Sequence, residues 1–464
     1  MLAVIAALRT PFGFADLGWQ VRLGDQMLRE GTPWIHEAFA ATHIGDPMVP
    51  NAWLSQVLYA WTNAVAGFTG LRMLDILFWA SGPVIASLPA RLLPERRLAI
   101  VIAMAMGYLL LLPTSDIRPQ NFASAGFALT LVMIQTVKSW RTALALGLPL
   151  FVLWQNLHPS VPIAALVLGL VSFVQWGLHL VGKAKRPVAL SALTAAAGAA
   201  IFATPAGVSV LAFARYNTIA SKAFGATEWF PLWHPVNRPF FVVFLASVAL
   251  VAAVCWIERK RLTPGIVIPT MVTMVMALIT ARFLFFYAIA IVPLLALLQI
   301  GKAPMHAASS RAILTGSAIS ALAAALASFV MPFLPQRDQG EELAKRLIAC
   351  TDAGASGTVF NAPTLGGAIV FYGTPHWKVA FDGRFYRFSR SEIQLMQRTA
   401  TEGDTLFQIE RIYHPAAFAL DLERSRALVT RIETQPEAWE RIFDNGQDVL
   451  FIRRQRSKQC SGSV

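Results

Sequence analysis

The sequence predicts an α-helical membrane protein with about eleven transmembrane helices and a C-terminal extracytoplasmic α/β domain. Three observations predict it: the chain is poor in charge, it contains long apolar runs, and its basic residues gather in alternate connections. Of the 464 residues, 56% are hydrophobic and 14% are charged, and the mean hydropathy is +0.54. Soluble domains carry about 25% charged residues, so this chain lacks the charge to face water over its whole surface.

Apolar runs that approach the length needed to cross a bilayer, about 20 residues, recur up to residue 333. The runs are 1–14, 71–92, 98–113, 121–137, 141–157, 160–182, 188–213, 238–257, 263–281, 283–300 and 311–333. The first run is short and contains Arg9. It is a poor signal peptide because no small-residue cleavage site follows it.

Clusters of Lys and Arg set the orientation of these spans. They fall in every second connection, at Arg91/Arg96/Arg97, Lys138/Arg141, Lys183/Lys185/Arg186, Arg259/Lys260/Arg261 and Lys302/Arg311. The positive-inside rule makes that side cytoplasmic. The N-terminus is then cytoplasmic and the C-terminus lies on the far side. The net charge of +13 is therefore explained by cytoplasmic loops, and a nucleic-acid partner is not expected.

One segment decides the number of spans. Residues 52–67 are apolar but short, and they contain Gln56, Thr62 and Asn63. A further span here would disturb the alternation of the basic clusters. The segment fits an interfacial helix better, so the first external loop is expected to run over 15–70 within a membrane domain of residues 1–335.

The composition changes to that of a soluble domain at about residue 336. An amphipathic helix is expected near 341, and helices are expected near 389–402 and 421–433. Short β-rich runs lie at 358–360, 368–372, 379–381, 417–420 and 449–452. Strands that alternate with helices predict an α/β domain with a largely parallel sheet over 336–464.

Two short motifs and the cysteines of this tail need separate interpretation. Gly366-Gly367 is expected in a turn or at a close approach of two segments, because no phosphate-loop context surrounds it. Asp382-Gly383-Arg384 is either a loop site or, as we favour, a turn with a local ion pair. Cys350 and Cys460 lie in an oxidising compartment, where a disulfide is allowed but not required.

Ionisable groups gather on the expected outer side of the membrane. Charged groups at membrane depth cost about 3 kcal/mol each on insertion scales, so they usually have a partner or a function. Arg72 and Asp75 are spaced to form a structural pair. Arg282 has no neighbouring acid in the sequence, so a functional and a structural role both remain open for it.

Several motifs resemble the GT-C superfamily of membrane glycosyltransferases, which includes protein O-mannosyltransferases and lipid A aminoarabinose transferases. An Asp follows the first span, a long external loop comes next, and an Arg-Phe pair precedes a late span. The motifs shared with a bacterial branch of this group are D-L-G-W-x-x-R-L-G (16–24), P-x-x-x-N-x-W-L-S-Q (47–56), R-P-Q (118–120), W-Q-N-L-H (154–158) and G-G…F-D-G-R (366–384).

The resemblance implies transfer of a sugar from a polyprenyl-phosphate donor to a lipid, glycan or protein acceptor outside the bacterial inner membrane. Asp16 would be the general base for the acceptor hydroxyl. The donor phosphate would be held by arginines, chiefly Arg282 and Arg118, with Arg22 and Arg72 behind them. The substrate cavity would include Trp19, Gln20, Trp53, Gln120, Asn156 and His158. For Trp19 and Trp53, packing is favoured over stacking on the sugar.

Some family features are missing. No second acid follows Asp16, and the acids Glu30, Glu37 and Asp46 of the same loop are expected at the solvated surface. No His/Asp/Glu set has metal-ligand spacing, so neither a metal nor another cofactor is expected. Three alternatives remain: a glycan ligase or polymerase with a diphosphate-linked donor, a transporter or flippase, and a non-catalytic protein of envelope glycan assembly. The sequence shows no inverted repeat, which argues against a transporter.

Overall fold

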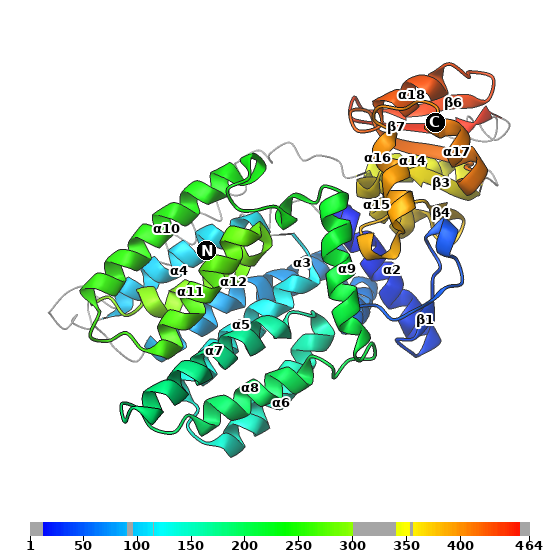
Figure 1. Cartoon of the computed structure of the whole chain (residues 1–464). Coiled ribbons are helices and arrows are strands. Elements are labelled where there is room, and N and C mark those ends of the chain that lie inside the picture. Colours follow the sequence, from blue (N-terminus) through cyan, green and yellow to red (C-terminus); the bar gives the residue numbers. More distant parts are fainter. Residues whose placement is uncertain (1–12, 91–95, 115, 300–339, 353–355, 455–464) are drawn as a thin grey trace. The chain divides into compact units, whose positions relative to one another are not determined.

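The computed structural model describes residues 13–90, 96–114, 116–299, 340–352 and 356–454 (Figure 1). The chain divides into two compact units, and each is described by itself. The helical unit takes its described residues from Phe68–Val210 and Thr227–Leu334. The sheet unit takes its described residues from Phe12–Gly67, Leu211–Ala226 and Pro335–Val464. The predicted spans 1–14 and 311–333 lie almost wholly outside the described residues.

The helical unit is built around α12 (Leu284–Leu295), in which every residue is buried. A helix that is apolar on all sides lies inside a core or in a bilayer, and α12 packs against α4, α5, α10 and α11. The other helices are α4 (Arg97–Leu111), α5 (Phe122–Thr136), α6 (Trp140–Leu157), α7 (Val161–Leu180), α8 (Val188–Ala200), α10 (Arg238–Ile257) and α11 (Pro264–Ile279). These helices surround one apolar core.

The described residues include 4 helical stretches that are long and apolar enough to cross a membrane. They are Trp53–Ala86, Arg97–Thr114, Val161–Leu180 and Pro235–Ile257. Shorter apolar helices lie at Val188–Ala200, Pro264–Ile279 and Ala281–Leu295. These apolar helices indicate a membrane protein.

Helix α3 (Trp53–Ala86) is two helices joined at a break. Gly67 has φ 59° and ψ −158°, a conformation that glycine adopts because it has no Cβ. The segment predicted as a separate interfacial helix, 52–67, is helical from Trp53 and ends at this break. The division between the two units falls at the same residue.

The single span predicted over 188–213 is wrong in one respect, because the chain is not continuously helical there. Helix α8 ends at Ala200 and α9 (Ser209–Ala223) begins after a turn. Pro205 lies in that turn, and its missing N–H cannot continue a helix. Residues of α9 belong to the sheet unit, where the Tyr216 hydroxyl donates to the Phe388 carbonyl at 2.6 Å.

The sheet unit contains a 5-stranded mixed sheet with the order β4-β3-β5-β7-β6. Its strands are β3 (Gly357–Asn361), β4 (Trp377–Val379), β5 (Ala417–Asp421), β6 (Trp439–Asp444) and β7 (Asp448–Arg453). The helices are α2 (Phe14–Glu30), α14 (Glu341–Asp352), α15 (Pro363–Gly373), α16 (Arg390–Arg398), α17 (Thr405–Tyr413) and α18 (Arg426–Glu433). A short antiparallel pair, β1 (Ile35–His36) and β2 (Pro47–Met48), precedes α3.

Two expectations for this sheet are wrong. Residues 368–372, predicted as a strand, lie inside α15, which begins with Pro363 at its first turn, a position that favours a helix. The sheet is mixed instead of largely parallel, because β7 pairs antiparallel with both β5 and β6. Strand β6 was not predicted, and neither was α17.

Helices α2 and α15 cross at two glycines. A Cβ added to Gly18 would lie 2.0 Å from the carbonyl oxygen of Gly367, and one added to Gly367 would lie 1.9 Å from that of Phe14. The backbones touch because neither residue has a side chain. The expectation that Gly366-Gly367 marks a close approach is confirmed, with the pair inside a helix and not in a turn.

The cysteines differ in state. Cys350 is buried on α14 and disulfide-bonded. Cys460, with which the sequence allowed a disulfide, lies outside the described residues. Cys255 is a partly buried free thiol on α10.

Candidate functional site

The first candidate site surrounds Asp16, in the first turn of α2. Asp16 is half-buried, and the turn at Gly383 lies directly against it. A Cβ added to Gly383 would lie 2.5 Å from Asp16 Oδ1 and 2.7 Å from Trp19 Nε1. Trp19 is 8% exposed, and its indole N–H meets no acceptor among the described residues. The helix that carries Asp16 therefore meets the Asp382-Gly383-Arg384 segment, which we expected to be either a turn with a local ion pair or a loop site.

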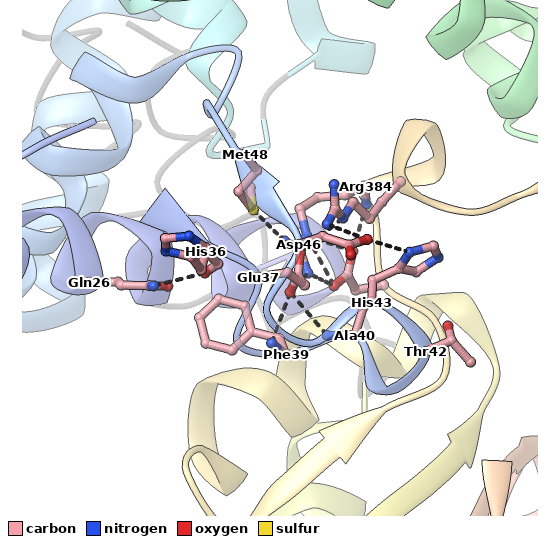
Figure 2. Close-up of polar contacts among 12 residues, drawn as sticks. Gln26, His36, Glu37, Phe39, Ala40, Thr42, His43, Asp46, Met48 and Arg384 are labelled. Atoms are coloured by element: carbon pink, nitrogen blue, oxygen red, sulfur yellow. Dashed lines mark hydrogen bonds and ion pairs between the residues drawn. The ribbon is translucent and has the colours of Figure 1, made fainter. Parts of the chain in front are cut away.

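Arg384, the last residue of this turn, is the centre of a buried ion cluster (Figure 2). Arg384 Nη1 donates to Glu37 Oε2 at 2.7 Å, and Nε donates to Asp382 Oδ1 at 3.0 Å. The side chains of all three residues are buried. Burial alone would raise the pKa of Glu37, but Arg384 and the N–H groups of Phe39 and Ala40 hold it at about 2. Glu37 and Arg384 are therefore both ionised at neutral pH.

The cluster extends toward the surface through Asp46 and His43. Arg387 contacts Glu37 at 3.3 Å and Asp46 at 3.2 Å. Both ring nitrogens of His43 face carboxylates. Nδ1 lies 3.1 Å from Asp46 Oδ2, and Nε2 lies 3.3 Å from Glu392 Oε2. His43 and Asp46 are labelled in Figure 2. Because a neutral imidazole has one donor and the charged form has two, this arrangement favours protonated His43.

These contacts test two expectations drawn from the sequence. The local ion pair expected within Asp382-Gly383-Arg384 is confirmed, but it also includes Glu37. The expectation that Glu37 is solvated is wrong, because its side chain is fully buried against Arg384. Its neighbours in His36-Glu37-Ala38-Phe39-Ala40 are mostly apolar, a local signal that could have indicated burial. No group of three His, Cys, Asp or Glu residues in the described part of the chain could hold a metal ion.

The second candidate site lies in the helical unit, where short 3-10 turns carry charged residues to the helix ends. Arg118 precedes Pro119–Asn121, Glu228 lies in Thr227–Trp229, and Arg282 lies in Ala281–Phe283. Glu228 Oε1 accepts from Arg118 at 3.2 Å and from Arg282 at 3.4 Å. The structure thus brings together the two arginines predicted as the main phosphate ligands and supplies the acid that the sequence near Arg282 lacks.

Further groups complete this arginine cluster. The Arg282 guanidinium lies over the Trp229 ring, 5.2 Å from its centre. Arg118 also approaches Asp116 at 3.9 Å. Burial would raise the pKa of Glu228, but the two arginines lower it below its usual value. Burial, together with the charge of Arg282, lowers the pKa of His158 to about 3, so the imidazole near the cluster is neutral.

Two other predicted phosphate ligands are placed differently. Arg22 Nε donates to the Phe371 carbonyl at 2.8 Å, and its Nη1 lies 3.5 Å from Asp25. This guanidinium is committed to the contact between α2 and α15. Arg72 is buried on α3, in the helical unit.

The predicted cavity residues are mostly buried. Asn156 donates to the Val152 and Ala203 carbonyls, both at 2.8 Å. Gln20 and Gln120 are 2% and 5% exposed, and each has one side-chain polar atom without a hydrogen-bond partner among the described residues. Trp53, at the start of α3, is half-buried. The packing role expected for Trp19 agrees with its burial.

The predicted residues are divided between the units. The sheet unit contains Asp16, Trp19, Gln20, Arg22 and Trp53. The helical unit contains Arg72, Arg118, Gln120, Asn156, His158 and Arg282. Two clusters result, a carboxylate site at the start of α2 and an arginine cluster at Glu228.

Comparison with solved structures gives a fold similarity. The chain is similar to the archaeal oligosaccharyltransferase AglB from Archaeoglobus fulgidus, solved in complex with an inhibitory peptide and a dolichol-phosphate, with a TM-score of 0.53 and 12% sequence identity. The match covers 93% of this chain and 70% of that chain. No protein-family model and no curated protein matches the sequence. At this identity the similarity shows a GT-C-like fold and no particular branch.

Proposed function

We propose that this protein is a glycosyltransferase that moves a sugar from a polyprenyl-phosphate donor to a lipid, glycan or protein acceptor on the outer face of the bacterial inner membrane. The GT-C-like fold and the apolar helices support a membrane enzyme of this class. The convergence of Arg118 and Arg282 on Glu228 carries the proposal. In the proposed membrane topology, the N-terminus is cytoplasmic and residues 336–464 form a periplasmic domain.

The arginine cluster has the chemistry to bind a phosphate. A guanidinium donates two parallel hydrogen bonds to phosphate oxygens and stays charged under all relevant conditions. Two guanidinium groups share one carboxylate here, and Trp229 lies under one of them. A phosphate monoester or diester would take over the donors that now point to Glu228. Fixed positive charge of this kind stabilises the leaving phosphate as the glycosidic bond breaks.

Asp16 is the proposed general base. A carboxylate within hydrogen-bond reach of an acceptor hydroxyl takes up its proton as the oxygen attacks the anomeric carbon. The half-buried carboxylate at the start of α2 suits that task, because helix N-termini favour negative charge. No step of this proposal requires a metal ion.

Native mass spectrometry of the protein in mild detergent tests the donor site. We expect a bound polyprenyl phosphate, free or glycosylated, that is lost in Arg282→Ala and retained in Asp16→Asn. The mass of any attached sugar identifies the donor. Arg259→Ala is the matched control, since Arg259 lies in a predicted cytoplasmic connection beyond α10. If added undecaprenyl phosphate binds equally to the wild type and to Arg282→Ala, the donor site is elsewhere, and a transporter or non-catalytic protein becomes the better interpretation.

A further inference from the structure

We infer that the C-terminal region holds the helix that carries Asp16, and that Gly383 is a positioning residue for the Asp16 carboxylate. The catalytic meaning of this inference rests on the proposed function, but the contact itself can be tested without any assay of activity. The contacts that carry the inference all lie within the sheet unit.

The first support is the crossing of α2 and α15. Gly18 and Gly367 allow the two backbones to touch, so α2 cannot slide or rotate without a clash. Arg22, one and a half turns beyond Asp16, donates to the Phe371 carbonyl near the end of α15. The Phe14 and Phe371 rings also contact each other, with centres 5.6 Å apart. Helix α2 is thus fixed on both sides of Asp16.

The second support is the turn that faces Asp16. The side of Gly383 where a Cβ would stand is occupied by Asp16 Oδ1 at 2.5 Å and by Trp19 Nε1 at 2.7 Å. A residue with a side chain would therefore displace these groups. The Asp16 carboxylate is the end of a flexible side chain and can rotate away at small cost. The buried Trp19 indole must shift as well, and the Ala15 carbonyl oxygen lies 3.1 Å from the same Cβ position.

The third support is the rigidity of the turn itself. Arg384 is buried between Asp382 and Glu37, and its guanidinium carbon lies 6.0 Å from the centre of the Trp19 ring. Two further contacts join the loop that carries Glu37 to strand β4. Ala40 pairs with Val379 as an isolated parallel bridge, and Lys378 Nζ donates to the Ala38 carbonyl at 2.9 Å.

These contacts give the C-terminal region a structural role in the proposed reaction, because it positions the helix that carries Asp16. The described residues of 12–67, 211–226 and 335–464 belong to one compact unit, so the described part of the tail belongs to the structure that presents Asp16. Removal of residues 336–464 should therefore destroy the Asp16 site, even in a protein whose arginine cluster is intact.

Carboxyl footprinting of the full-length protein tests the contact directly. A carbodiimide with glycine ethyl ester labels accessible carboxylates, and peptide mass spectrometry compares the rates at Asp16 and Asp25. In Gly383→Ala we expect labelling of Asp16 to rise severalfold, while labelling of Asp25 stays unchanged. The control is Gly198→Ala, because a Cβ at Gly198 meets no atom within 4 Å. Equal labelling of Asp16 in Gly383→Ala and the wild type would overturn the inference.

Glycan products in cells test the catalytic meaning. Gly383→Ala should lower product by up to about a hundredfold, which a 1 Å misplacement can cost, with retention of polyprenyl phosphate in native spectra. It should cause no further loss when combined with Asp16→Asn, because both changes act on one group. Independent, multiplicative losses would overturn the positioning role. If Asp16→Asn alone leaves product unchanged, the proposed function fails, while the footprinting result still decides the contact.

Discussion

The Arg384 guanidinium donates to the Glu37 carboxylate at 2.7 Å, across 347 positions of the chain, with both side chains fully buried. Asp382 supplies a second buried carboxylate to the same guanidinium. A buried charge is costly unless it is paired, so the early loop and the C-terminal region depend on each other for their charge balance. This mutual dependence gives the first prediction.

Breaking the pair should destabilise the sheet unit strongly. Glu37→Ala leaves Arg384 with one carboxylate and an empty volume, and loss of one member of a buried pair costs about 3–5 kcal/mol. Hydrogen exchange of β5, which lies in the middle of the sheet, measures the change in opening free energy. The control is Glu402→Ala, since Glu402 pairs with Arg398 at the exposed surface and such pairs contribute about 0–1 kcal/mol. Similar effects of the two substitutions would contradict the assigned role.

The α2–α15 crossing predicts a contrast between two glycines of the same region. In Gly367→Ala the new methyl would stand 1.9 Å from the Phe14 carbonyl oxygen. That atom belongs to the backbone and cannot rotate away, so the helices must separate. Overpacking typically costs about 1–3 kcal/mol. We expect a clear fall in the thermal midpoint of Gly367→Ala and a smaller fall in Gly383→Ala, where the two nearest atoms belong to side chains. Equal midpoints for Gly367→Ala and the wild type would show that the helices accommodate the methyl.

The arginine cluster predicts different results for its acid and its bases. Arg282→Lys keeps the charge but loses the fork of donors, so polyprenyl-phosphate binding should weaken about tenfold, the effect of about 1.4 kcal/mol. Glu228→Gln removes the negative charge that competes with a phosphate for the same guanidinium groups, so binding should be equal or tighter. Native mass spectrometry with a titration of undecaprenyl phosphate distinguishes the two. If Glu228→Gln abolishes binding as well, the cluster is better explained as a structural link between three turns.

Part of this architecture could be predicted from the sequence. Apolar runs and basic clusters indicate a membrane protein because the bilayer imposes their length and charge bias. The nine runs between residues 71 and 300 all contain helix, although 188–213 is interrupted at Pro205. The helical break at Gly67 coincides with the expected end of an interfacial segment.

The rest depended on contacts between distant residues. Residues 368–372 have strand-like composition, but packing of Gly367 on α2 favours a helix there, and β-propensity is strongly context-dependent. Glu37 was expected in water because its partner, Arg384, lies 347 positions away. Arg282 lacked an acid nearby in the sequence, and Glu228, 54 positions away, supplies it. Local patterns carry no information about these pairings.

The position of His43 between two carboxylates predicts a pH-dependent stability. The hydrogen bond to Glu392 raises the pKa of His43 above its usual 6.5; burial opposes this, and Asp46 adds to it, while Arg387 lowers it. Because the folded pKa exceeds the unfolded one, the stabilisation is complete below about pH 6.5 and is lost as pH rises through the folded pKa.

The thermal midpoint of the sheet unit should therefore fall as pH rises above about 6.5, with hydrogen exchange in α16 increasing over the same range. His43→Gln keeps a polar side chain of similar reach but does not titrate, so its midpoint should be lower at acidic pH and flat across this range. His36→Gln is the control, because the side chain of His36 has no carboxylate contact among the ion pairs of the described residues. A pH slope in His43→Gln equal to that of the wild type would assign the effect to another group.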